Sequence, residues 1–178
     1  MTMEFVFAGF GGQGVLTAGM VLAYAGAEKD LDVTWIPSYG AEMRGGTANC
    51  TVKLSQEEVA SPFPKRLDVL VAMNEPSLVK FAPSVKPGGH IVANSSVIRN
   101  IPEVPGVEVH AVAVNDIAAA AGNPRSANLC ALGAAVACAG GMITLEEVEN
   151  GMRGYFTKIK DHSGNLEIMR SGYRAVKP

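Results

Sequence analysis

Charged residues are scarce in this sequence. Asp, Glu, Lys and Arg make up 18% of the 178 residues, whereas hydrophobic residues make up 48%. A typical soluble domain has about 25% charged residues, so this chain has few charged residues for the surface of a small monomer. Two explanations are open: part of the surface faces a protein partner, or glycine and alanine take the places of charged residues. The first explanation also predicts that the isolated chain can self-associate.

Basic clusters and targeting segments are also lacking. The 15 Lys and Arg residues are scattered and the formal net charge is −2, which argues against nucleic-acid binding. The N-terminus has no basic region of the kind that begins a secretory signal. The longest uncharged apolar run, residues 129–145, contains glycines and is too short to span a membrane, so it predicts a buried helix. We therefore expect a soluble cytoplasmic protein that does not contact membranes.

Cysteine is rare, and its pattern excludes an iron–sulfur cluster held by this chain alone. The cysteines are Cys50, Cys130 and Cys138. They form no Cys-x-x-Cys pair, and such a cluster needs four suitable ligands, so free buried thiols are expected. The histidines are His90, His110 and His162. No histidine stands at metal-ligand spacing from a cysteine, so the sequence predicts structural histidines and no metal site.

The order of apolar segments predicts one α/β domain over residues 1–178, with a Rossmann-like fold. Strand-like runs alternate with segments of helical periodicity, which is typical of a mostly parallel sheet with helices on both faces. A continuous apolar run predicts a strand buried on both faces at residues 67–73, and alternation predicts a half-buried strand at residues 47–54. The other predicted strands are residues 4–8, 32–37, 90–93 and 107–112, with a turn at 87–89. The predicted helices are residues 15–29, 75–81, 115–121, 127–140, 144–150 and 152–160, and the tail after 163 is ambiguous.

A glycine-rich loop follows the first predicted strand. It reads Gly9-Phe10-Gly11-Gly12-Gln13-Gly14, which matches G-x-G-x-x-G, a pattern that lets the backbone approach a phosphate at a helix N-terminus. A dinucleotide site also requires an acidic residue about 20 positions further on, yet the second strand ends in Ile36-Pro37-Ser38-Tyr39. NAD(P) binding is therefore disfavoured. The alternative is that the glycines allow the helix to pack closely on the strand.

A second loop is more specific. It reads Pro37-Ser38-Tyr39-Gly40-Ala41-Glu42-Met43-Arg44-Gly45-Gly46. The glycines after Arg44 would let that side chain or the backbone approach another surface closely. The alternative is that Glu42 and Arg44 form a surface ion pair of little energetic value.

Together the two loops resemble those of the gamma subunit of the 2-oxoacid:ferredoxin (acceptor) oxidoreductases. The similarity extends to about residue 155 and includes Ala72-Met73-Asn74, Val85-Lys86-Pro87-Gly88-Gly89 and Asn94-Ser95-Ser96. It also includes Asn128-Leu129, followed by Ala131-Leu132-Gly133. One segment is more similar to 2-oxoglutarate and ketoisovalerate members than to pyruvate members: its sequence is Met43-Arg44-Gly45-Gly46-Thr47-Ala48-Asn49.

The resemblance implies a subunit of an enzyme that oxidatively decarboxylates a 2-oxoacid to acyl-coenzyme A and CO2 and reduces ferredoxin. Thiamine diphosphate, Mg²⁺ and iron–sulfur clusters are then expected on alpha, beta or ferredoxin-like delta partner subunits, with coenzyme A as co-substrate of the complex. The isolated chain is expected to be inactive. Two alternatives remain at this point: a stand-alone nucleotide-binding Rossmann domain of a reductase, and a purely architectural module.

Four predicted strand ends carry polar, turn-forming residues. Because ligands of open α/β sheets lie outside the carboxyl ends of the strands, we expect these segments to gather at one functional edge. That edge would pack on the catalytic subunits or line a channel reached by coenzyme A. The alternative is that its polar residues only cap helices and form turns. The candidate residues are Gly11, Gly12, Gln13, Gly14, Ser38, Tyr39, Glu42, Arg44, Gly45, Gly46, Asn74 and Asn94.

Overall fold

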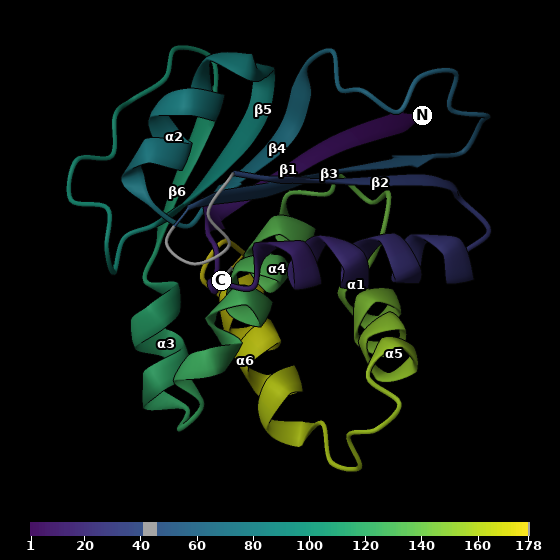
Figure 1. The fold of residues 1–178 in the computed structure, drawn as a ribbon, viewed down its shortest axis with the longest axis vertical. Helices are drawn as coiled ribbons and strands as arrows, with labels where there is room; N and C mark the ends of the chain where they lie inside the picture. The colour runs from purple at the N-terminus through teal and green to yellow at the C-terminus, as the bar shows by residue number, and fades with distance from the viewer. Residues whose placement is uncertain (41–45, 178) are drawn as a thin grey trace.

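The computed structural model describes residues 1–40 and 46–177, which form a six-stranded sheet (Figure 1). The strands lie in the order β2-β3-β1-β4-β5-β6. Strand β3 is antiparallel to both of its neighbours, whereas the β1–β4, β4–β5 and β5–β6 pairs are parallel. The prediction of a mostly parallel sheet is confirmed. The strands are β1 (Thr2–Phe10), β2 (Asp32–Tyr39), β3 (Thr47–Ser55), β4 (Leu67–Ala72), β5 (Val85–Asn94) and β6 (Glu108–Val112).

Helices cover both faces of the sheet, as predicted, but unequally. In Figure 1, α2 lies above the sheet and the other labelled helices lie below it. Each face has its own hydrophobic cluster, and β1 supplies both because its side chains alternate: Phe5 and Phe7 face the larger cluster, Val6 and Ala8 the smaller. The helices are α1 (Val15–Glu28), α2 (Glu75–Phe81), α3 (Val114–Ala120), α4 (Ala127–Ala137), α5 (Leu145–Tyr155) and α6 (Ser163–Arg174).

The first part of the uncharged run predicted as a buried helix forms α4 at the centre of the larger layer. The helix predicted over residues 127–140 ends at Ala137, and residues 138–143 form turns and bends. Every residue of α4 is buried, and the helix touches β4, β5, α1, α3 and α6. A helix that is apolar on all sides is stable only when it is surrounded. Among the described residues, no helix is both long and apolar enough to cross a lipid bilayer.

Several predicted boundaries need correction. The two helices predicted at residues 144–150 and 152–160 form one helix, α5, which continues through Gly151 and ends at Tyr155, so residues 156–160 are not helical. Gly151 packs against Ala25 of α1, where an added Cβ would lie 2.5 Å from the Ala25 Cβ. The predicted turn at residues 87–89 lies inside β5, where Gly88 has a φ of 77° and the pairing with β4 shifts register. The ambiguous tail forms α6, whose apolar side is buried.

Strand β3 is buried on both faces rather than on one. Its polar residues Thr51, Lys53 and Ser55 retain only 9%, 5% and 1% of their accessible surface. The Lys53 ammonium lies 2.9 Å from the Glu4 carboxylate and donates a hydrogen bond to the Ser61 carbonyl at 2.8 Å. Glu4 of β1 therefore pairs the buried charge, and the segment that follows β3 supplies a second acceptor, which the alternating pattern could not reveal.

Helices α4 and α6 pack at backbone distance through two glycines. A Cβ added at Gly133 would lie 1.9 Å from the carbonyl oxygen of Met169, and one added at Gly172 would lie 1.9 Å from that of Cys130. No real side chain tolerates such a contact, so both positions require glycine for the helices to approach this closely.

We expect Gly133→Ala to destabilise the fold by about 2 kcal/mol or more, because the methyl group forces α6 away from α4. This corresponds to a fall in Tm of about 5 °C or more, measurable by thermal unfolding. The matched control is Gly164→Ala in the first turn of α6, where an added Cβ meets no atom within 4 Å. Equal Tm values for the two variants would contradict the close helix contact.

Candidate functional site

The carboxyl ends of β1, β2, β4 and β5 meet at one edge of the sheet, as predicted. Strands β1 and β2 run in the same direction because each is antiparallel to β3. One row of paired residues crosses the sheet beside this edge: Ser38 pairs with Asn49, which pairs with Ala8, and Ala8 also pairs with Ala72, which pairs with Ala93. The loops after four strands therefore converge, and we refer to this region as the carboxyl edge.

Gln13 ties the glycine loop to the neighbouring strand end. Its Oε1 accepts hydrogen bonds from the Phe10 N–H at 2.7 Å and the Asn74 Nδ2 at 3.2 Å. Its Nε2 donates to the Met73 carbonyl at 3.1 Å. A Cβ on Gly9 would lie 2.6 Å from the Gln13 Oε1. The Gln13 amide therefore fixes the end of β1 against the end of β4, and Gly9 leaves the space for it.

The backbone donors of the glycine loop are largely used within the protein. The Gly11 N–H donates to the Gly46 carbonyl at 2.9 Å, and the Gln13 N–H donates to the Phe10 carbonyl at 3.1 Å. The Phe10 N–H is bonded to the Gln13 side chain. A dinucleotide pyrophosphate bound in this loop would need free N–H groups, so the geometry favours the close-packing interpretation of the glycines.

Two of the predicted site residues, Asn74 and Asn94, have structural partners. The Asn74 Oδ1 accepts from the Ser77 N–H at 2.9 Å and caps α2. The Asn94 Nδ2 donates to the Asn115 Oδ1 at 2.9 Å and to the Met73 carbonyl at 3.3 Å. Both asparagines are buried. They shape the carboxyl edge and hold its loops rather than present free groups to a ligand.

A cavity of about 300 Å³ opens at the carboxyl edge between the start of α1 and the facing ends of β2 and β3. Helix α1 begins after Gly14, which has a φ of 72° and supplies no side-chain cap. Tyr39, 61% exposed, and Phe10, 36% exposed, line the same cavity. An uncapped helix start beside exposed aromatic rings suits contact with an anionic group or with a protein surface. Three other predicted site residues, Glu42, Arg44 and Gly45, lie outside the described residues.

Asn128 belongs to this region, although it was not among the predicted site residues. Its Nδ2 donates to the Gly14 carbonyl at 3.2 Å, and a Cβ on Gly14 would lie 2.7 Å from that nitrogen. Asn128 comes from the start of α4, far along the chain, so no local pattern could place it here. The available signals were its place in the family resemblance and an amide side chain directly before the apolar run.

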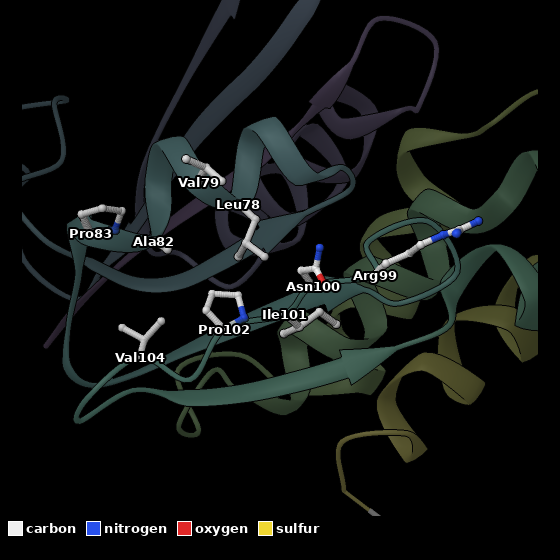
Figure 2. Close-up of a pocket in the computed structure, with 9 residues that line it drawn as sticks. All are labelled: Leu78, Val79, Ala82, Pro83, Arg99, Asn100, Ile101, Pro102 and Val104. Carbon is white, nitrogen blue, oxygen red and sulfur yellow. The ribbon is translucent and has the colours of Figure 1, made fainter.

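A larger hollow, of about 650 Å³, lies on the other face between α2 and the segment that follows β5 (Figure 2). Its walls are mostly apolar, with Leu78 and Ile101 among the lining residues, and the Arg99 side chain extends away from the other labelled side chains. Arg99 is the one ionisable residue of the lining. This hollow offers no acid, base or nucleophile, so the polar groups of the carboxyl edge remain the better candidate site.

Comparison with known proteins identifies the family. A family model described as pyruvate ferredoxin/flavodoxin oxidoreductase matches residues 4–175. The chain belongs to this family. The resemblance inferred from the two loops is thereby confirmed, because both loops lie inside the matched region.

Relatives within the family carry the names of oxidoreductase subunits. The chain is 39% identical over 166 residues to the ketoisovalerate oxidoreductase subunit VorA of Methanothermobacter marburgensis, covering 93% of this chain but 34% of that protein. It is 31% identical over 175 residues to the 2-oxoglutarate synthase subunit KorC of Archaeoglobus fulgidus, covering 96% of this chain and 88% of that one. The chain thus spans about a third of the length of VorA.

Solved structures of the family share the fold. The keto/oxoacid ferredoxin oxidoreductase gamma subunit from Geobacter sulfurreducens superposes with a TM-score of 0.80 at 26% identity, over 98% of both chains. The 2-oxoglutarate:ferredoxin oxidoreductase from Magnetococcus marinus, solved with 2-oxoglutarate, coenzyme A and succinyl-CoA, gives a TM-score of 0.85 at 25% identity. This chain covers 31% of that longer one. The family fold therefore occurs both as a separate chain and as part of a larger one.

We expect Gln13→Ala to lower the free energy of unfolding by about 1–3 kcal/mol. The Phe10 N–H and the Asn74 Nδ2 lose their acceptor, and the Met73 carbonyl loses one of its two side-chain donors. Urea denaturation measures the change. Gln56→Ala is the matched control, since Gln56 is exposed and only its backbone N–H is bonded. A loss no greater than that of the control would mean that Gln13 does not hold the carboxyl edge together.

Proposed function

We propose that this chain serves as the gamma component of a multi-subunit 2-oxoacid:ferredoxin oxidoreductase that acts on 2-oxoglutarate or a branched-chain 2-oxoacid. The observation that carries the proposal is the match along almost the whole chain: the family model over residues 4–175, and a named gamma subunit over 98% of both chains. The substrate class follows the relatives, whose names refer to ketoisovalerate and 2-oxoglutarate.

In this proposal the complex converts a 2-oxoacid and coenzyme A to acyl-coenzyme A and CO2 and passes electrons to ferredoxin. We assign thiamine diphosphate and Mg²⁺ to the alpha and beta partners. The iron–sulfur clusters are assigned to a partner such as a ferredoxin-like delta subunit, because three buried cysteines cannot supply the four ligands of a cluster. The role of this chain is then assembly and support of the catalytic subunits.

We further propose that the carboxyl edge is the surface through which the chain contacts its partners. Exposed Tyr39 and Phe10 lie there beside the cavity at the start of α1. Aromatic side chains are enriched in protein interfaces, and the low overall charge of the chain suits a surface covered by a partner. The uncapped N–H groups at the start of α1 are the part of this edge that a phosphate of coenzyme A could approach.

A stand-alone nucleotide-binding reductase domain has less support. The N–H groups of Phe10, Gly11 and Gln13 in the glycine loop are bonded internally. Asp32, the acidic residue of β2, begins this strand at its other end, and its carboxylate accepts the Val59 N–H at 2.6 Å. It is therefore not free to hold a ribose at the carboxyl edge. Calorimetric titration of the chain with NADH should give no binding heat under this proposal.

The function is tested by purifying the chain without oxygen from its native source and identifying the proteins that accompany it. The eluate is assayed for coenzyme A-dependent dye reduction with 2-oxoglutarate, 2-oxoisovalerate and pyruvate in turn. Co-elution of larger subunits, with activity on one of the first two acids, is the expected result. A chain that elutes alone from an extract without such activity would contradict the proposal.

The contact surface is tested by Tyr39→Glu, which places a charge on the carboxyl edge without touching the core. We expect it to reduce recovery of the partner subunits by about tenfold or more, as for an interface aromatic residue. Phe63→Glu is the control, because Phe63 is similarly exposed, at 67%, but lies on the segment between β3 and β4. If assembly is intact and the KM for coenzyme A rises, the edge lines the coenzyme A channel. If neither changes, the edge is not the contact surface.

A further inference from the structure

A cluster of metal-ligand side chains lies away from the carboxyl edge. It contains His90 of β5, His110 of β6 and Cys138, the residue that follows α4, whose ligand atoms all lie within 4.8 Å of one another. The His90 Nδ1 and the His110 Nε2 are 3.2 Å apart. The Glu108 carboxylate lies beside them, with one oxygen 3.5 Å from the His90 nitrogen and the other 3.7 Å from the His110 nitrogen.

The sheet register explains why these residues meet. His90 pairs with Glu108 and Val92 pairs with His110, so alternation places both histidines and Glu108 on the same face of the β5–β6 pair. That face is the one covered by α4, since Val92 belongs to the larger hydrophobic cluster. Cys138, directly after the end of α4, lies against the same face. None of these positions has metal-ligand spacing along the chain, so the sequence predicted no metal site.

From this geometry we propose that His90, His110, Cys138 and Glu108 bind one zinc ion, or a divalent transition metal ion of similar chemistry. Two imidazole nitrogens bound tetrahedrally to zinc at about 2.0–2.1 Å lie about 3.3 Å apart, and a nitrogen and a thiolate sulfur about 3.6 Å apart. The histidine nitrogens are already at 3.2 Å. The ligand atoms lie within 4.8 Å of one another, so the sulfur must approach a nitrogen by about 1.2 Å at most, a movement that side-chain rotation can supply. Imidazole, thiolate and carboxylate are the ligands that zinc prefers.

The burial of the four side chains suits such a site. Cys138 is buried, the His110 and His90 side chains are 13% and 27% exposed, and Glu108 is 67% exposed. Cys138 and His110 therefore lie on the inner side of the cluster, whereas Glu108 lies on its solvent-exposed side.

The bound ion would join β5, β6 and the end of α4, three elements that are distant along the chain. Its effect is therefore structural: it fixes the outer strand pair against the central helix. This inference is independent of the proposed function, because it concerns the stability of the chain and not its partners or substrate.

The test uses the full chain, stripped with a chelator under reducing conditions and titrated with Co²⁺ without oxygen. We expect one equivalent to produce the intense visible bands of tetrahedral cobalt together with thiolate-to-cobalt charge transfer, and Zn²⁺ to displace it. Saturating Zn²⁺, at about a hundredfold excess over Kd, should raise Tm by about 5–10 °C. The weak spectrum of hydrated cobalt and an unchanged Tm would overturn the proposal.

Matched variants locate the site. Cys138→Ala should abolish the charge-transfer band, whereas Cys130→Ala, which removes another buried thiol at α4, and His162→Ala should leave it intact. Glu108→Gln should weaken metal binding by about 10-fold or more, since the loss of a ligand costs at least as much as the loss of a supporting group. Because Glu108 is exposed, this variant remains informative even if Cys138→Ala unfolds. Equal Co²⁺ affinity and spectra in all four variants would place the metal elsewhere and overturn the proposal.

Discussion

Burial of α4 on all sides is the constraint on which the rest of this structure depends. An uncharged helix without a polar face must be enclosed, and here the sheet, α1, α3 and α6 enclose it. Gly133 and Gly172 make the enclosure possible on the α6 side, where backbone touches backbone. Any substitution that moves α6 outward exposes the most apolar segment of the chain to water.

Helix α4 also connects the two regions of the molecule that carry polar groups. Near its start, Asn128 bonds the Gly14 carbonyl at the end of the glycine loop. Just after its end, Cys138 meets the histidines of β5 and β6. A rigid, fully packed helix holds both regions at a fixed separation. The carboxyl edge and the His–Cys cluster thus share one support while facing different parts of the surface.

The carboxyl edge is stabilised mainly by its own side chains. The Asn74 amide donates to the Gln13 side chain, and the Gln13 and Asn94 amides both donate to the Met73 carbonyl. These side chains therefore act as internal connections. The groups left facing outward are the Tyr39 and Phe10 rings and the start of α1. This division favours a surface that fits a partner over a site that performs chemistry alone, in agreement with membership of a family whose relatives are named as subunits.

The sequence by itself determined the α/β class, the buried run that became α4, the strand ends that would converge, and the family. All four can be read from the sequence because they depend on local periodicity and on short motifs, which involve residues close together along the chain. Tertiary structure decided the antiparallel placement of β3, the burial of Lys53 against Glu4, the role of Asn128 and the meeting of His90, His110 and Cys138. Each of these joins residues that are remote along the chain, and only sheet register and helix packing bring such residues into contact.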